Sequence, residues 1–404
     1  MRLLLLQGPF GGFSKHAIKK LSASGNKVFK VSFNGGDYLS GGAFGDKFTQ
    51  PPHKFRLYLK NYIKQNSIEG VILFGDCRFY HRIAVRLCNK MSIPIAALEE
   101  GYLRPNYITV ESDGLNANSK ADFLEPVEEP KLLTDFNDSH KTKNLLLTKT
   151  PHVILYYIAK FLMRPWFIYY KHHRSYSIFK ETFYWVRSAR RRMLTSFREQ
   201  KDIRKITAQP YFFVPLQVHN DSQIIYHSDF ESIEAFIDEV VSSFARFAPP
   251  DTALVLKHHP QDLGFKKYSK YIKELATHYN IVNRVVVLND FSVPNLLRYC
   301  EGCVTINSTV GLSALIHSKP VIALGSCFYD LKGITHGEGL DRFWSHPEAS
   351  KEDLKRTFFH NIRVKTQVNG SYYDYSQKNI DACVQMILKV LQKKIKRVCV
   401  ATND

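Results

Sequence analysis

Short apolar runs alternate with longer amphipathic segments along most of this 404-residue chain. In the first hundred residues, the apolar runs predict strands, and the segments between them have the apolar spacing of helices, as in residues 16–24 and 81–91. The strands predicted in this part are RLLLLQG (2–8), KVFKVSF (27–33), VILFGD (71–76) and PIAALEEG (94–101). This alternation favours a parallel, doubly wound α/β sheet.

The same alternation returns from residue 211. The strands predicted there are YFFVPLQV (211–218), TALVLKHHP (252–260), RVVVLND (284–290), GCVTINS (302–308) and PVIALG (320–325). They predict a second Rossmann-like domain, followed by a terminal helix at residues 375–398. Two domains also agree with the chain length, since a domain has about 100–200 residues.

The segment between the two alternating regions has a different composition. Residues 118–150 are polar and predict a loop or linker, whereas residues 151–205 are helical, aromatic and strongly basic. Two interpretations of the basic segment stay open. It is a solvated connector whose aromatic side chains pack on a domain, or a membrane surface with Trp and Tyr at the headgroup level and Lys and Arg facing anionic lipid. The expected divisions of the chain are 1–150, 151–205, 206–374 and a C-terminal helix and tail at 375–404.

The charge of the chain points to an anionic partner. The net charge is +19 and the pI is about 9.5, which suits nucleic acid, an acidic membrane or a phosphorylated or carboxylated substrate. No nucleic-acid-binding motif is present and the basic residues concentrate in residues 151–205, so no nucleic-acid partner is expected.

The first apolar run, MRLLLLQGPFGGF, has one basic residue and no small-residue cleavage site, so it predicts a strand rather than a signal peptide. A cytoplasmic protein with reduced cysteines is therefore expected. No apolar run reaches the roughly 18 residues of a spanning helix. The nearest, residues 152–170, is interrupted by Lys160, Arg164 and Pro165.

Polar residues gather where the predicted strands of the first domain end, and ligands of such sheets bind at the carboxyl ends of strands. Gly35 and Asp76 follow two strands and could contact a substrate, although tight turns also need glycine. Glu99 and Glu100 end another strand, where a carboxylate is a fair general base. Alternatively, one of them pairs with Arg104.

The second domain has three such clusters. The residues that could bind a ligand are Gln217, His219, Asp221 and Ser222 in the first cluster, Lys257, His258 and His259 in the second, and Asn307, Ser308 and Thr309 in the third. The second cluster could hold a phosphate or a cytosine nucleotide. The third opens a helix, which is a natural phosphate seat, although ordinary turns and N-caps use the same residues. Cys300 and Cys303 form one C-x-x-C without a second pair, so no metal site is predicted.

In this order, the motifs resemble those of the capsule polysaccharide biosynthesis/export proteins of the KpsS/LipB type. They are QGPFGGF, FNGGD, FGDCR, EEGYLRP, LQVHNDSQI, KHHP, INSTVGLSALIHSKPV and VKTQVNGSYY. The resemblance implies two Rossmann-like domains facing a cleft, the GT-B arrangement. It also implies a retaining β-Kdo transferase, which moves Kdo from CMP-β-Kdo to a phosphatidylglycerol-type lipid and so starts the capsule linker. Residues 1–150 would be the acceptor side and residues 206–374 the CMP-sugar-binding side, with no metal and no cofactor beyond the donor substrate.

The resemblance also implies roles for single residues. His259 and Pro260 would bind cytidine and phosphate, as would the helix start at Ser308 and Thr309. Asp221 would be the nucleophile of a double displacement, oriented by Gln217, His219 and Ser222. Glu99-Glu100-Gly101 matches an acid-acid-glycine motif whose second acid is often Asp in relatives, so either glutamate could be the acid/base.

Two other functions stay open: a non-catalytic capsule export or assembly scaffold, and a transferase for another CMP-activated acidic sugar. For the leading hypothesis, the expected partners are the CMP-sugar donor, an anionic phospholipid acceptor and other capsule assembly and export proteins. The expected location is the cytoplasmic surface of the inner membrane.

Overall fold

The computed structural model describes residues 1–125, 145–171, 209–219, 222–260, 262, 266–289 and 291–401. The chain forms two compact units: unit 1 comprises Met1–His173 and Thr357–Asp404, and unit 2 comprises Arg174–Arg356. These units differ from the divisions expected at residues 150, 205 and 374. Residues 151–171 and 357–374 both belong to unit 1: α5 packs on α2, and β12 pairs with β6 of its sheet.

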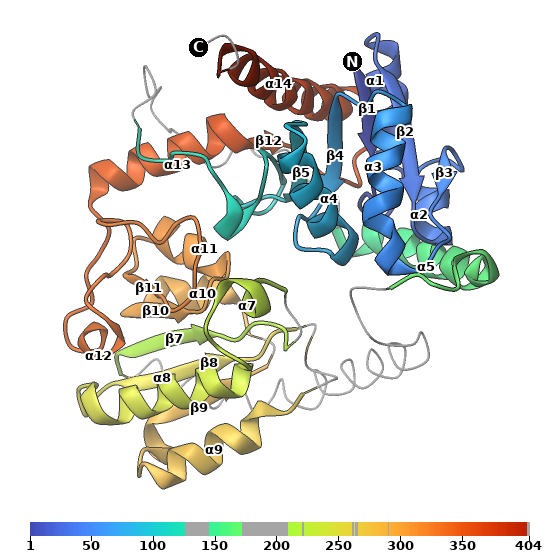
Figure 1. The fold of residues 1–404 in the computed structure, drawn as a ribbon. Coiled ribbons are helices and arrows are strands. Elements are labelled where there is room, and N and C mark those ends of the chain that lie inside the picture. Colours follow the sequence, from blue (N-terminus) through green and yellow to red (C-terminus); the bar gives the residue numbers. More distant parts are fainter. Residues whose placement is uncertain are drawn as a thin grey trace. The chain divides into compact units, whose positions relative to one another are not determined.

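Unit 1 is built on a seven-stranded sheet with the order β12-β6-β5-β4-β1-β2-β3 (Figure 1). The strands from β3 to β5 are parallel to their neighbours, whereas β6 runs antiparallel to β5 and β12 antiparallel to β6. The strands are β1 (Arg2–Leu5), β2 (Lys27–Ser32), β3 (Asp46–Lys47), β4 (Gly70–Phe74), β5 (Ile95–Glu100), β6 (Tyr107–Ser112) and β12 (Gln367–Asn369). The parallel α/β sheet predicted for the first domain is therefore confirmed.

Helices cover both faces of this sheet. Apolar side chains of α1 and α14 share one buried cluster, and those of α3 and α4 share another. The helices of unit 1 are α1 (Phe13–Ala23), α2 (Gly35–Ser40), α3 (Phe55–Gln65), α4 (Phe79–Lys90), α5 (Leu145–Leu162), α13 (Glu352–Thr366, which begins at the end of unit 2) and α14 (Gln377–Ala401), with short 3-10 turns η1 (Pro52–Lys54), η2 (Asn116–Asn118) and η3 (Arg164–Phe167). The terminal helix predicted from the sequence is thus α14.

Helix α5 packs against the start of α2 at very short range. A Cβ atom on Gly35 would lie 2.3 Å from the carbonyl oxygen of Ala159, and one on Gly36 would lie 2.5 Å from that of Tyr156. Only glycine permits this approach. The first part of the predicted basic connector is therefore anchored on unit 1 through two glycines.

Unit 2 has a five-stranded sheet, entirely parallel, with the order β11-β10-β7-β8-β9. Its strands are β7 (Tyr211–Pro215), β8 (Ala253–Lys257), β9 (Val285–Leu288), β10 (Gly302–Thr305) and β11 (Val321–Ala323). Every residue of β7 and β8 is buried, as expected of central strands covered on both faces. The second Rossmann-like domain predicted from the sequence is confirmed.

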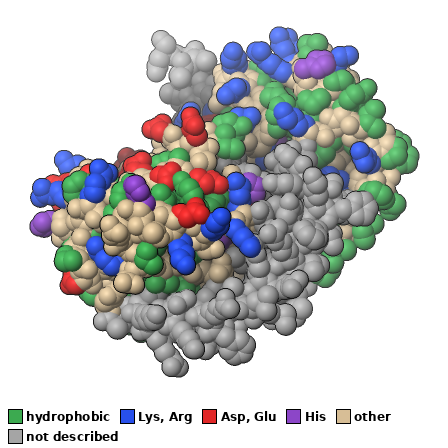
Figure 2. Space-filling model, turned by 90° about the horizontal axis from the view of Figure 1, so that it is seen from below, with side chains coloured by type: hydrophobic (Ala, Val, Ile, Leu, Met, Phe, Trp, Pro, Cys, Tyr) green, Lys and Arg blue, Asp and Glu red, His purple; other side chains and the backbone are tan. Residues whose placement is uncertain are grey.

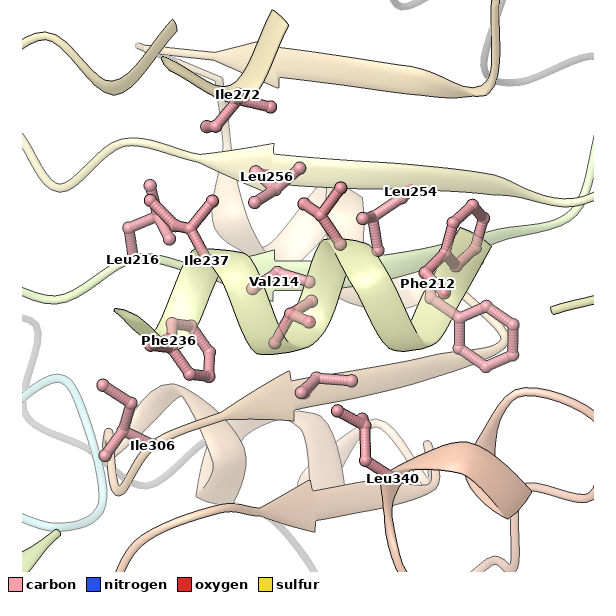
Figure 3. Packing of buried hydrophobic residues seen from close by; sticks show 14 of the residues in the cluster. Phe212, Val214, Leu216, Phe236, Ile237, Leu254, Leu256, Ile272, Ile306 and Leu340 are labelled. Atoms are coloured by element: carbon pink, nitrogen blue, oxygen red, sulfur yellow. The ribbon is translucent and has the colours of Figure 1, made fainter. Parts of the chain in front are cut away.

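Helix α8 (Ile233–Phe247) shows how the sequence builds the core of unit 2. The Ser232 side chain caps it by accepting from the Ala235 backbone N–H at 3.1 Å. Its buried stripe repeats at helical spacing and lies on the sheet (Figure 3): Ile233, Phe236, Ile237, Val240, Val241 and Phe244. The other elements are α7 (Ser222–His227), α9 (Tyr268–His278), α10 (Val293–Tyr299), α11 (Val310–Ile316), α12 (Leu340–Phe343) and the turn η4 (Val282–Arg284).

Candidate active site

In the sheet of unit 2, β8 and β9 lie on one side of β7, and β10 and β11 lie on the other, so the switch point is between β7 and β10. Two buried amide side chains, Gln217 and Asn307, lie at this switch point. The Nε2 of Gln217 donates to the Oδ1 of Asn307 at 3.0 Å, and the Asn307 backbone N–H donates to the Oε1 of Gln217 at 3.2 Å. Asn307 also donates to the carbonyl oxygens of Gln223 and His227, at 2.9 and 3.2 Å. The pair therefore joins the ends of two strands to helix α7, at the place where such sheets bind ligands.

The buried carboxylate of Asp262 binds His219, two residues after Gln217. One oxygen of Asp262 lies 2.5 Å from the His219 Nδ1, and the other accepts from the His219 backbone N–H at 3.1 Å. Asp262 is 0% exposed. Burial of the neighbouring Tyr268 raises the pKa of that tyrosine, and the Asp262 carboxylate acts in the same direction. A carboxylate on Nδ1 fixes the ring orientation and stabilises a positive charge on the imidazole, as in other acid/base sites.

Asp221, the central residue of the predicted site, lies outside the described residues together with Asn220, and Ser222 is the first residue of α7. Gln217 and His219 lie directly before them, and the helix that follows is held by Asn307. The roles assigned to Asp221 and Ser222 stay predictions.

The KHHP motif follows β8 with two of its side chains inside the unit. Lys257 and His258 are both buried; the Lys257 Nζ donates to the carbonyl oxygens of His258 and Asn289, at 3.3 and 3.5 Å. The His258 ring stacks on Tyr268 with 5.0 Å between centroids. His259 is more exposed, and its carbonyl oxygen accepts from the Asp262 N–H at 2.9 Å. Of the three, His259 has the most exposed side chain, and its predicted contact with cytidine and phosphate stays a prediction.

The predicted helix start after β10 forms local hydrogen bonds. Ser308 Oγ accepts from the Val310 N–H at 3.2 Å, and Thr305 Oγ1 accepts from the Ser308 N–H at 3.3 Å. Thr309 precedes the first residue of α11, and its side chain makes no capping bond there. Ser308 and Thr305 thus make the local hydrogen bonds of an ordinary turn, an alternative that the sequence left open. Phosphate binding by Ser308 and Thr309 stays a prediction.

The two glutamates of unit 1 end strand β5. Glu99 accepts from the Asn116 Nδ2 at 2.8 Å. The Glu100 side chain is 44% exposed, with the Lys149 Nζ at 3.8 Å. Arg104 donates to the Gly101 carbonyl oxygen at 3.3 Å. Arg104 is therefore held by the backbone of the motif, and the Glu99 carboxylate by Asn116.

Asp76 and Gly35 have structural contacts within unit 1. The Asp76 carboxylate accepts from the Leu115 N–H at 3.0 Å and from the Asn118 Nδ2 at 2.8 Å, which fixes the loop around η2. Gly35 is buried against α5. These contacts explain both residues without a ligand, and their predicted contact with the acceptor stays untested.

No cluster of three or more His, Cys, Asp or Glu residues suited to a metal ion is found in the part of the chain that the structure describes. Cys300 and Cys303 are both buried thiols, and burial raises the pKa of Cys300 to about 12. In the same described part, none of the helices has the length and apolar character needed to cross a membrane.

Asp262 is the site residue that sequence reasoning missed. It lies three residues after His259, outside the KHHP motif, and nothing local marks it as buried. The amide pair between Gln217 and Asn307 was also unpredicted, although both residues were candidates. The available signal was their shared place, two residues beyond neighbouring strands of the sheet.

Comparison with known proteins agrees with the resemblance noted in the sequence. Residues 69–373 match the family described as "Capsule polysaccharide biosynthesis protein". The chain is 37% identical to the capsule polysaccharide export protein KpsS of Escherichia coli over 92% of this chain and 97% of that protein. It is 39% identical to the capsule polysaccharide modification protein LipB of Neisseria meningitidis serogroup B, over 92% of this chain and 91% of that protein.

Among solved structures, the β-Kdo 2,7 transferase KpsC of Thermosulfurimonas dismutans aligns over 96% of this chain and 99% of its own, with 14% identity and a TM-score of 0.47. The family match and the two relatives together cover most of the sequence. The chain therefore belongs to the capsule polysaccharide biosynthesis protein family.

Proposed function

We propose that this protein is a retaining glycosyltransferase that moves β-Kdo from CMP-β-Kdo to a phosphatidylglycerol-type lipid. The observation that carries the proposal is the polar edge of unit 2. Gln217, which belongs to a buried amide pair, and His219, which a carboxylate holds, come shortly before Asp221 in the sequence. A purely structural strand end would not need this many buried, mutually oriented polar groups.

The proposed reaction has two displacement steps. The Asp221 carboxylate attacks the anomeric carbon of Kdo while the bond to the CMP phosphate oxygen breaks, and CMP leaves with the bonding electrons. The acceptor hydroxyl then attacks the same carbon, its proton passes to a base, and the bond to Asp221 breaks. Two inversions give net retention of configuration.

The surrounding residues of unit 2 support the first step in this proposal. His219, held by Asp262, offers a ring nitrogen that is oriented and able to carry positive charge beside the anionic donor. His259 contributes to the phosphate and cytidine contact. Gln217 acts through Asn307 by fixing the start of α7, so both are positioning residues.

We assign the base of the second step to Glu100. Its side chain is partly exposed, and the Lys149 Nζ lies 3.8 Å from its Oε1. Glu99 already accepts a hydrogen bond from Asn116. Of the two adjacent carboxylates of unit 1, we therefore choose Glu100 as the base.

The proposal includes a membrane surface, which we assign to α5 and η3. Residues 145–171 contain no Asp or Glu and have four basic residues. At the right-hand edge of Figure 2, where α5 lies, hydrophobic and basic side chains are interspersed. The exposed large side chains of this segment are Ile154, Leu155, Ile158, Phe161, Leu162, Trp166, Ile168 and Tyr169. An apolar face bordered by cations suits the interface of an anionic bilayer.

The function is tested by transfer itself. Purified protein is incubated with CMP-Kdo, regenerated in place, and a fluorescent phosphatidylglycerol analogue, and the lipid product is analysed by mass spectrometry. We expect the lipid to gain one Kdo residue. CMP-sialic acid in place of CMP-Kdo tests the other acidic sugar, and absence of transfer from either donor would favour the scaffold function.

The proposed reaction uses no cofactor or metal beyond the donor substrate. With preformed CMP-Kdo supplied, addition of EDTA should leave the initial rate of transfer unchanged. A rate that falls on chelation and returns with Mg²⁺ would contradict this part of the proposal.

A further inference from the structure

An arginine without a carboxylate partner lies at the switch point of unit 1, between β1 and β4. Arg78 follows β4 and immediately precedes α4, whose first turn contains no acidic residue. Its side chain is partly exposed, and its guanidinium carbon lies 4.8 Å from the ring centroid of Phe74. Among the described residues, its guanidinium has no hydrogen bond or salt bridge.

The two carboxylates that act on the pKa of Arg78 are engaged by other residues. Burial lowers the pKa of Arg78, while Asp37 and Glu99, among other neighbours, act in the opposite direction. The Asp37 carboxylate binds the Lys30 ammonium at 2.9 Å and the Phe33 N–H at 3.1 Å. Glu99 accepts from Asn116. A partly exposed guanidinium that pairs with no carboxylate among the described residues can take an anionic ligand from solution.

A buried tyrosine hydroxyl lies at the same switch point, where Gln7, two residues beyond β1, binds it. The Tyr156 oxygen accepts from the Nε2 of Gln7 at 2.8 Å and from the Nδ2 of Asn34 at 2.9 Å. Tyr156 is 3% exposed. Because two donors already occupy its oxygen, its own hydrogen is left to donate to a third group.

We propose that Arg78 and the Tyr156 hydroxyl bind the phosphodiester of the glycerophospholipid headgroup on unit 1. The planar guanidinium matches two phosphate oxygens, and the start of α4 adds a favourable dipole. Tyr156 belongs to α5, whose other side carries the exposed apolar residues assigned to the membrane. One helix would therefore contact both the bilayer and the headgroup. The assignment rests on the proposed function for its choice of a lipid over another anion.

The test is direct binding, which needs no turnover. Dihexanoyl phosphatidylglycerol, kept below its micelle concentration, is titrated into the full chain in the presence of CMP by isothermal calorimetry. We expect Arg78→Gln to weaken binding about tenfold to a hundredfold, as for loss of a charge-assisted pair. Arg78→Lys should weaken it less. The matched control is Arg86→Gln, an exposed arginine on the same helix, which should bind as the parent does.

Further probes separate the possible anions. Glycerophosphoglycerol should bind at the same seat without acyl chains, whereas inorganic phosphate and free Kdo should bind much more weakly. The proposal is overturned if folded Arg78→Gln or Arg78→Lys binds the lipid as the parent does, or if free Kdo is the preferred probe. Thermal unfolding shows whether each variant is folded. If Arg78→Gln does not fold, the lipid binding of Arg78→Lys decides the question.

The transfer assay separates this inference from the proposed function. If Arg78→Gln transfers Kdo as fast as the parent protein, the proposed function is retained and the phosphodiester-binding site at Arg78 is rejected. Loss of lipid binding in Arg78→Gln, together with absence of Kdo transfer by the parent protein, would support the seat and reject the function.

Discussion

The two units have the same strand order and use it differently. The parallel strands run β3-β2-β1-β4-β5 in unit 1 and β9-β8-β7-β10-β11 in unit 2, so each has one switch point after its first strand. Gln7 and Gln217 lie two residues beyond these first strands, and Asp76 and Asn307 lie two residues beyond the fourth. Topology alone would make the two edges equivalent.

The side chains make the edges different. In unit 2, Gln217 and Asn307 bind each other and join the strand ends. In unit 1, Gln7 donates to Tyr156 and Asp76 binds the loop at Leu115, so the equivalent pair does not form. Strand order therefore locates the edge of the sheet where a ligand binds. The residues two positions beyond each strand decide whether amide side chains bridge the strand ends there or charged and hydroxyl groups remain.

The largest expected effect is on the transfer rate and follows from removing the proposed nucleophile of unit 2. Asp221→Asn is nearly isosteric, so the fold and donor binding should survive, but an amide is a poor nucleophile. Transfer should fall at least about 10³-fold, because enzymes supply roughly 10⁶-fold accelerations or more. Initial rates with the fluorescent lipid measure this, and CMP binding by calorimetry serves as the folding control. A well-folded variant with near-normal transfer would remove Asp221 from the mechanism.

At the edge of unit 1, Glu100→Gln should slow transfer by roughly 10²–10⁴-fold, the usual effect of removing a general base. Glu99→Gln should have a smaller effect, since an amide still has an oxygen to accept from Asn116. Both variants are compared in the same rate assay. The reverse order of effects would assign the base to Glu99.

The membrane assignment predicts an effect confined to one side of α5. Ile158→Glu combined with Phe161→Glu places two charges on its exposed apolar face and should weaken co-sedimentation with phosphatidylglycerol vesicles at least about tenfold, because charges are costly at an apolar interface. Turnover of a detergent-soluble acceptor should be spared. Leu57→Glu, at an exposed leucine on α3, is the control. Equal loss in the control, or undiminished sedimentation of the α5 variant, would argue against this surface.

The amide pair of unit 2 can be broken directly. Asn307→Ala removes the partner of Gln217 and leaves the carbonyl oxygens of Gln223 and His227 without this donor. The free energy of unfolding should fall by about 1–3 kcal/mol, as for buried groups left unsatisfied. Denaturant unfolding measures this change. Asn307→Asp keeps the size and restores only the acceptors, so full recovery by that variant would contradict the role given to the donated bonds.

The smallest expected effect concerns the anchor of α5 on unit 1. Gly36→Ala places a methyl group within about 2.5 Å of the Tyr156 carbonyl oxygen, so α5 must shift. Overpacking of this kind costs about 1–3 kcal/mol, part of which relaxation of the helix end can recover. Thermal unfolding and protease sensitivity near residue 145 measure it. Gly25→Ala is an uncrowded control, although its positive φ adds its own strain.

The sequence predicted the parallel strands of both units because buried strands are short apolar runs with polar ends. It did not predict β6 or β12, which pair across more than 250 residues, Ile108 with Val368 for example. Such pairing leaves no local pattern. For the same reason, residues 357–374 were assigned to the second domain although they complete the sheet of unit 1.

The candidate site was predictable in its residue types and less so in its contacts. The strand-end residues Gln217 and Asn307 bind each other, since parallel strands end at one edge, while their role at a substrate stays a prediction. Asp262 was missed because its burial depends on the loop after β8 folding back onto His219. The substrate contact predicted for Gly35 stays a prediction. The close approach of α5 to Gly35 was not predicted, because no local pattern indicates such a contact.

The central claim is that unit 2 forms a covalent bond with the transferred sugar at Asp221. The most direct measurement is intact and peptide mass spectrometry of protein incubated with CMP-Kdo without acceptor and quenched in acid. We predict that the peptide containing Asp221 gains one Kdo residue, and that the adduct disappears when the lipid acceptor is added. Release of CMP with no adduct on that peptide, or an adduct on another residue that turns over with acceptor, would contradict it.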